Sequence, residues 1–103
     1  MPDLPLDLCL RPSGLPVGVR PYKRTRDFDE HSVPASLTRR HNTKPGVWGA
    51  ICVLEGRLLY RDLDRGTETI LSPGCPGLAA PEVWHSVEAL GPVRFFVQFY
   101  AAP

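Results

Sequence analysis

The sequence predicts a small all-β domain that closes into a barrel or a jelly roll. Proline and glycine, 12 and 9 of the 103 residues, interrupt the chain too often for long helices. Apolar residues alternate with polar ones or form short runs, and turn sequences recur about every 8–12 residues. About eight short strands would leave exposed sheet edges, so closure is favoured over an open sheet.

We divide the chain into two parts, an N-terminal arm and one domain. Residues 1–16 are rich in proline and are expected to form an extended arm, either lying along a sheet edge or loose. Residues 17–103 are expected to form the barrel. Within them, 17–25 is compatible with a strand, 26–34 is polar and reads as a loop, and 37–40 reads as a short strand.

The clearest strand is 47–54, which is apolar on both faces and should be buried on both. A turn at Glu55-Gly56 is expected to lead into a second strand, 57–63. A further turn then leads into 67–72, so the three strands form a β-meander.

Two strands are expected in the C-terminal third, 78–90 and 93–101, separated by a turn at Gly91-Pro92. The last strand alternates, so its residues divide between two faces of the sheet. One face carries Val93, Phe95, Val97 and Phe99, and the other carries Phe96, Gln98 and Tyr100.

Composition excludes several classes of function. A formal net charge of +1 supplies no field that would attract nucleic acid or an anionic membrane surface. No apolar run approaches the roughly 20 residues of a membrane span, and the N-terminus lacks the basic and apolar regions of a signal peptide. We therefore expect a cytoplasmic protein. Its cysteines, Cys9, Cys52 and Cys75, lack the spacing of a thiolate zinc site.

Histidine is the main candidate for chemistry, because neutral imidazole is the commonest metal ligand and a usual general base. His31 lies in a polar loop and is interpreted as a surface residue. His85 shares a strand face with Val83 and Val87, so it should point inward. It can meet His41 only if their strands are neighbours, and the alternative is that each is simply a structural histidine.

Two further polar residues are candidates for the same site. Glu82 could join imidazole in a site for zinc, iron or manganese. However, it would face away from His85 on a regular strand, and its alternative is a solvated turn carboxylate. Gln98 lies among aromatic residues, and it is either buried with hydrogen-bond partners or exposed on the outer face.

Three segments resemble a known family: RRHNTKPGVWGAICVLEGRLLY, APEVWHSVEAL and GPVRFFVQFY. They are similar to the cupin-like domain at the N-terminus of tellurite-resistance TehB proteins and to the stand-alone YeaR-like family. This resemblance implies a compact cupin, a double-stranded β-helix whose interior can hold a metal, and it suggests a homodimer.

The resemblance also implies site residues. His41 and His85 match histidines of the family's sequence blocks and are its implied ligands for a divalent ion, which could be zinc, iron, manganese or nickel. Glu82 and Gln98 fall at positions that could add to this set. The general cupin pattern expects HxH and a glutamate in the first block, where this sequence has only His41, and this departure argues against dioxygenase chemistry.

Three functions follow as hypotheses. The first is a metal-binding or small-molecule-binding sensor or accessory module, linked through the family to tellurite, oxyanion or oxidative stress. The second is a metal-dependent enzyme of unknown substrate. The third is a metal-free interaction module. The methyltransferase activity of TehB proteins belongs to a separate downstream domain, so methyl transfer is not expected of this sequence.

Overall fold

The computed structural model describes residues 12–39 and 41–103. Two long antiparallel strands form its centre, β4 (Trp48–Asp62) and β7 (Trp84–Ala101). Both strands are rich in the β-branched and aromatic residues that pack well on a pleated surface. Every other described strand pairs with one of these two.

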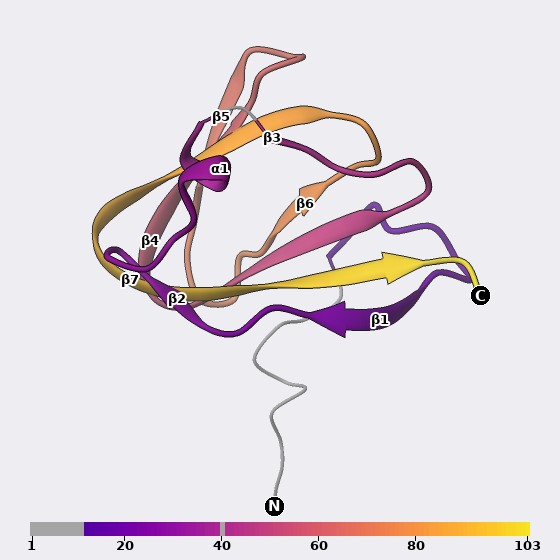
Figure 1. Ribbon diagram of the computed structural model, residues 1–103, viewed down its shortest axis with the longest axis horizontal. Helices are drawn as coiled ribbons and strands as arrows, with labels where there is room; N and C mark the ends of the chain where they lie inside the picture. Colours follow the sequence, from indigo (N-terminus) through magenta and orange to yellow (C-terminus); the bar gives the residue numbers. More distant parts are fainter. Residues whose placement is uncertain (1–11, 40) are drawn as a thin grey trace, which may run out of the picture.

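The shorter strands flank the central pair on both sides. β1 (Arg20–Arg24), β2 (Phe28–Asp29) and β3 (His41–Asn42) pair antiparallel with β7. β5 (Thr67–Leu71) and β6 (Gly77–Ala79) pair antiparallel with β4. The result is one seven-stranded sheet (Figure 1).

Both long strands bend near their middles, where the sequence predicted turns. The register between them shifts on either side of Glu55-Gly56. Gly56 has a φ of +79°, and a Cβ added to it would lie 2.1 Å from the carbonyl oxygen of Pro92. The predicted turns at Glu55-Gly56 and Gly91-Pro92 are therefore wrong, because both positions lie in irregular, bulged stretches of continuous strands. Figure 1 shows the uninterrupted curve of β7.

The bend folds the sheet over itself without closing it. The edge formed by β1, β2 and β3 does not pair with the edge formed by β5 and β6 anywhere in residues 12–39 and 41–103. The predicted closed barrel is thus wrong. Closure was expected from about eight short strands, whereas two long bent strands bring the halves of one open sheet together.

The main core lies between the two halves of the folded sheet. Residues from the first half of β4 and the second half of β7 pack there against residues from the opposite halves. The predicted inward face of the last strand is confirmed for Val93, Phe95 and Val97, which are all buried. Other buried members of this core are Phe28, Ile51, Val53, Leu58, Tyr60, Leu71, Ala79 and Val87.

A smaller core covers the outer face of the sheet. Ala50, Cys52, Phe96 and Tyr100 are buried there. The predicted burial of 47–54 on both faces is therefore confirmed. Two of the partly buried residues that pack against this cluster, Leu15 and Val19, come from the segment before β1. The described end of the arm thus covers apolar side chains of the sheet.

A single helical turn, α1 (Ala35–Thr38), overlaps the strand predicted at 37–40; the prediction is wrong for 37–39, and residue 40 lies outside the described residues. Pro34 precedes α1, and the amide of Leu37 donates a hydrogen bond to the carbonyl of Pro34. Proline is compatible with the start of a helix because it has no amide hydrogen to satisfy. No helix in the described residues has the length and apolar character needed to cross a membrane.

The bend depends on the absence of a side chain at Gly56, and this can be tested. We expect Gly56→Ala to lower the free energy of unfolding by about 3 kcal/mol or more, because a positive φ is unfavourable for alanine and the new Cβ would overlap the Pro92 carbonyl. Urea denaturation measures this change.

Gly66→Ala is the matched control. Gly66 has a similar φ of +71°, but no atom lies within 4 Å of its added Cβ. Only the backbone cost of about 1–2 kcal/mol should appear. Equal losses in the two variants would contradict the role of the close approach at Gly56.

Candidate functional site

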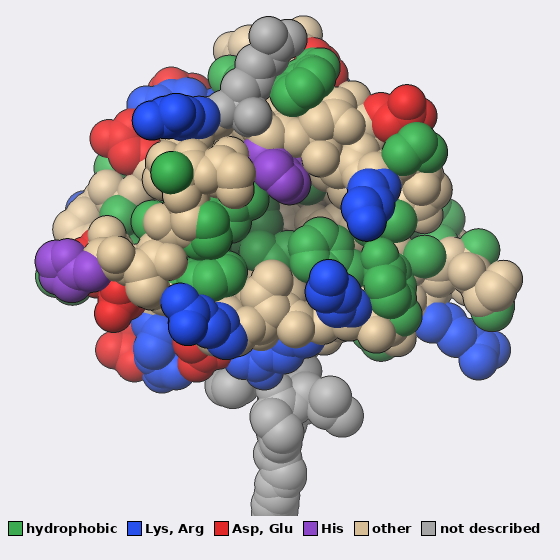
Figure 2. Space-filling model, in the orientation of Figure 1, with side chains coloured by type: hydrophobic (Ala, Val, Ile, Leu, Met, Phe, Trp, Pro, Cys, Tyr) green, Lys and Arg blue, Asp and Glu red, His purple; other side chains and the backbone are tan. Residues whose placement is uncertain are grey.

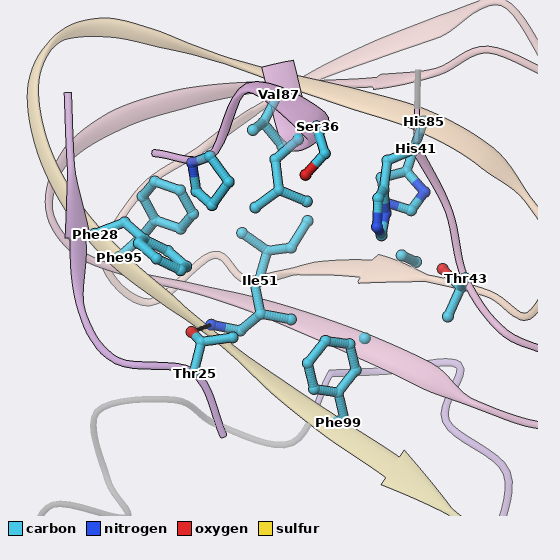
Figure 3. Close-up of a pocket in the computed structure, with 15 residues that line it drawn as sticks. Thr25, Phe28, Ser36, His41, Thr43, Ile51, His85, Val87, Phe95 and Phe99 are labelled. Carbon is cyan, nitrogen blue, oxygen red and sulfur yellow. Dashed lines mark hydrogen bonds between the residues drawn. The ribbon is translucent and has the colours of Figure 1, made fainter. Parts of the chain in front are cut away.

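A cavity of about 210 Å³ lies within the main core, and we call it the inner pocket. Its lining is largely apolar, and Figure 3 shows that its ends differ. His41, His85 and Thr43 form one end, while Phe28 and Phe95 lie at the other. The remaining lining residues are Thr25, Pro34, Ser36, Leu37, Gly49, Ile51, Ala79, Val87, Val97 and Phe99.

The structure brings His41 and His85 together. Their strands are neighbours, which is the condition that the sequence analysis set for such a contact. The two histidines are direct register partners on β3 and β7. The Nδ1 atom of His41 lies 3.3 Å from the Nε2 atom of His85, and their ring centroids are 5.2 Å apart. Direct pairing across two strands therefore places both imidazoles at one end of the inner pocket.

Hydrogen bonding fixes which nitrogens carry protons. The Nδ1 atom of His85 lies 3.0 Å from the carbonyl oxygen of Val83, which can only accept a hydrogen bond. Nδ1 of His85 is thus the donor, and Nε2 of neutral His85 carries a lone pair. His41 must then donate from Nδ1 to that lone pair. This leaves Nε2 of neutral His41 as an acceptor.

Burial favours the neutral form of His85. The side chain is buried and stacks on the ring of Tyr60, with centroids 5.7 Å apart. Desolvation lowers the pKa of His85 below its ordinary value, and the neighbouring His41 lowers this pKa further, while the hydrogen bond to Val83 acts in the opposite direction. Burial also raises the pKa of Tyr60 to about 12, so its hydroxyl stays protonated.

Thr43 adds a hydroxyl to the same end of the pocket. It is only 4% exposed, and its side chain forms no hydrogen bond with any other residue in the described parts of the chain. Sequence reasoning did not select Thr43. The signal was available, because residues two apart on an extended strand share a face and Thr43 follows His41 by two.

Glu82 does not join the two histidines. Its side chain is exposed, and its φ of 61° turns the chain before β7 begins. Its backbone has a structural role instead, because its amide donates to the carbonyl of Thr43 and its carbonyl accepts from Asn42 Nδ2. These bonds hold the β3 segment against β7.

Gln98 also lies away from the pocket. Its Nε2 atom donates a 2.8 Å hydrogen bond to the carbonyl of Lys23 on β1, so this amide links two strands. His31 is exposed, as expected for a surface residue, and lies 3.5 Å from Glu30. Within the described residues, no group of three or more His, Cys, Asp or Glu side chains gathers where it could hold a metal.

Comparison with protein families and curated proteins identifies relatives. A sequence model described as the TehB-like domain matches residues 23–97. The chain is 34% identical over 74 residues to a probable S-adenosyl-L-methionine-dependent methyltransferase, TehB, from Haemophilus influenzae strain Rd. The match includes 67% of this chain and 26% of the relative. The chain thus matches about a quarter of the length of that methyltransferase.

Solved structures share the fold. The crystal structure of TehB from Haemophilus influenzae superimposes with a TM-score of 0.77 at 30% identity, over 84% of this chain and 32% of TehB. A structural-genomics crystal structure of an Escherichia coli K12 protein gives a TM-score of 0.80 at 24% identity, over 86% of this chain and 96% of that one. The second likeness shows the fold alone.

The lowered pKa of His85 predicts a pH dependence of stability. The unfolded chain keeps the ordinary histidine pKa of about 6.5. Below that pH the unfolded state binds a proton that folded His85 resists, so stability should fall as pH drops through about 6.5 and level off below the lowered pKa. The free energy of unfolding, measured by urea denaturation between about pH 8 and about pH 5, tests this.

His85→Gln should flatten this dependence, whereas His31→Gln should leave it unchanged because His31 is exposed. Each unit of pKa difference is worth about 1.4 kcal/mol. An unchanged slope in His85→Gln would show that another group causes the dependence.

Proposed function

This chain belongs to the TehB-like domain family, and on that basis we propose that it is a small-molecule-binding module whose ligand occupies the inner pocket. One observation carries the proposal: a mostly apolar cavity of about 210 Å³ has two imidazoles and the Thr43 hydroxyl together at one end, while two further hydroxyl residues, Thr25 and Ser36, lie elsewhere in its lining. Ligand sites in proteins are commonly concave and apolar, with a few polar groups that orient the ligand.

The polar end has unused hydrogen-bonding capacity that a ligand would satisfy. Nε2 of neutral His41 can accept a hydrogen bond, and it can donate one when His41 is protonated. The buried hydroxyl of Thr43 can do either. A buried polar group without a partner costs roughly 1–3 kcal/mol. A ligand with one polar group and an apolar body would therefore fit the pocket.

A metal-assisted form of this function is the second candidate, and the spacing of the imidazoles supports it. Two nitrogens bound to one tetrahedral zinc ion at about 2.0–2.1 Å lie about 3.3–3.4 Å apart. Nδ1 of His41 and Nε2 of His85 are separated by 3.3 Å. These two atoms fit two positions on an ion, and the third protein ligand of a catalytic zinc site is not found among the described residues.

In this second candidate, His41 and His85 would hold a divalent ion, and the bound small molecule or water would complete its coordination. The ion would act as a Lewis acid that binds an oxygen of the ligand. Metal binding would break the hydrogen bond between the histidines, while Val83 would keep His85 in the same orientation through Nδ1. The donor set gives no reason to propose a reaction.

Family membership supports one cellular setting for this proposal. A relative matched over a quarter of its length is named as a probable methyltransferase. We propose that the present domain acts as a sensor or accessory module in the cellular response to tellurite or other oxyanions. Kinship with the cupin and jelly-roll architecture, and assembly as a homodimer, are parts of the same proposal.

Ligand binding in the pocket is tested with benzyl alcohol, which has an apolar ring and one hydroxyl. We expect saturable amide chemical-shift changes in NMR spectra of the isotopically labelled protein, centred on pocket residues such as Thr43, Val87 and Val97. Thr69 and Gly74, which line a separate depression, serve as internal controls. Changes centred on those residues, or no saturation, would contradict the proposal.

The metal-assisted form is tested by metal content. We expect inductively coupled plasma mass spectrometry of the untagged protein, reconstituted with zinc, iron, manganese or nickel, to find up to one ion per chain. His41→Ala/His85→Ala should lose it, because both nitrogens are removed. His31→Ala and Glu82→Ala should retain it, because both side chains are exposed. No metal in any protein would exclude this form while leaving ligand binding in the pocket intact.

A further inference from the structure

A second depression lies beside the inner pocket. This outer depression, of about 160 Å³, shares His41, Thr43 and Phe99 with the inner pocket. The two cavities therefore adjoin at the polar end of the inner pocket, where both are lined by His41 and Thr43. Figure 2 shows a hollow on this face of the molecule, with a histidine and basic side chains around it. The other residues of the outer depression are Tyr22, Lys23, Asn42, Lys44 and Val47.

The side chains of fixed charge in the described lining of the outer depression are all positive. The chain has only two lysines, Lys23 and Lys44, and both line the outer depression. Among residues 12–39 and 41–103, no aspartate or glutamate lines either the outer depression or the inner pocket. The protein as a whole has a formal net charge of only +1, so this concentration of positive charge is local. An anion would therefore be attracted to the mouth of the pocket and not to the protein in general.

In the part of the chain that the structure describes, neither lysine has an acidic partner. Ion pairs elsewhere on the described surface join Arg24, Arg61 and Arg94 to carboxylates. Lys23 and Lys44 form no ion pair within residues 12–39 and 41–103. Carboxylates are present in two other depressions, one containing Asp62 and one containing Glu55 among its lining residues. Within the described residues, the absence of acidic side chains is thus a property of the outer depression and the inner pocket.

A buried polar group lies where the two cavities meet. Thr43 lines both cavities, is 4% exposed, and has a hydroxyl without a hydrogen bond in the described residues. Figure 3 places this side chain beside His41 and His85. A hydroxyl can donate to a carboxylate oxygen, and charge-assisted hydrogen bonds of this kind are about twice as strong as neutral ones. The Thr43 hydroxyl and the two lysines thus belong to the lining of the same depression.

We propose that the natural ligand is a small organic carboxylate, with its apolar body in the inner pocket and its carboxylate directed toward the Thr43 hydroxyl and the two lysines. This inference rests on the proposed function and specifies its ligand class. A cavity of about 150 Å³ holds benzene, so the inner pocket of about 210 Å³ accommodates one ring or a short chain. The apolar lining opposes a fully hydrated inorganic oxyanion, which has no apolar body to bury.

The test compares probes that differ mainly in charge. Benzoate carries a carboxylate, benzyl alcohol is its neutral counterpart of nearly equal size, and inorganic sulfate has charge without an apolar body. Dissociation constants at neutral pH are measured by NMR titration of the full chain. We expect benzoate to bind roughly tenfold more tightly than benzyl alcohol, with sulfate much weaker than both. Raising the salt concentration from about 20 to about 300 mM should weaken benzoate binding and leave benzyl alcohol binding unchanged.

Variants of Lys23 and Lys44 test whether these two charges cause the preference for benzoate over benzyl alcohol. Lys23→Gln/Lys44→Gln should lower benzoate affinity roughly tenfold and leave benzyl alcohol unchanged. Lys23→Arg/Lys44→Arg keeps the charge and should keep most of the preference. Arg20→Gln/Arg57→Gln removes the same charge from exposed residues that line neither cavity, and it should bind benzoate as the parent protein does.

The outcomes separate this inference from the function on which it rests. Equal affinity for benzoate and benzyl alcohol would overturn the carboxylate proposal and leave ligand binding in the pocket standing. Binding of neither organic probe would overturn both. Sulfate binding at least as tight as benzoate would identify an inorganic oxyanion site and would also overturn the carboxylate proposal. Thr43→Val should bind benzoate more weakly than the parent protein does, because it removes the hydroxyl donor. Valine has nearly the shape of threonine, so this variant should keep the fold.

Discussion

The close approach of Gly56 to the carbonyl of Pro92 is the constraint on which the rest of the structure depends. It occurs where the two longest strands bend together, and no side chain would fit there. Because β4 and β7 stay paired on both sides of the bend, one sheet supplies both walls of the core. The inner pocket lies between these walls, so its existence follows from the same bend.

The histidine pair is compatible with this apolar interior because each neutral ring donates one hydrogen bond to the next group in the series. His41 donates to His85, and His85 donates to the carbonyl of Val83. These two hydrogen bonds satisfy three of the four imidazole nitrogens while both histidines stay neutral. A charged imidazole would be costly to bury. The two hydrogen bonds also leave one nitrogen of His41 and the Thr43 hydroxyl available near the surface opening. The same arrangement that stabilises the interior thus presents polar groups to a ligand.

The polar and apolar ends of the pocket give it a direction. Lysines line the outer depression, histidines and Thr43 lie at the junction, and aromatic side chains close the far end. This gradient favours a molecule with an apolar body and one polar head. Membership of the TehB-like family agrees with the fold, since TehB from Haemophilus influenzae shares it over 84% of this chain. The physical argument for a ligand depends only on the lining of the cavities.

Sequence by itself determined the all-β class, the two-faced burial of the strand containing Ala50 and Ile51, and the inward face of Phe95 and Val97. These follow from local alternation and composition, which do not depend on distant contacts. The family resemblance selected His41 and His85 for one site, which the residues alone had left open. Sequence did not reveal that Gly56 bends a strand instead of ending it, because a bulge and a turn use the same residues.

Only the tertiary structure decided which polar side chains reach the pocket. Glu82 turns outward at a positive φ and Gln98 binds the backbone of β1, whereas Thr43, two residues after His41, lines the inner pocket. Lys44 and Lys23 line the outer depression, and Lys23 is brought there by the pairing of β1 with β7. Strand periodicity assigns a residue to a face, but the partners across that face are set by register and by the bend, which are properties of the whole folded sheet.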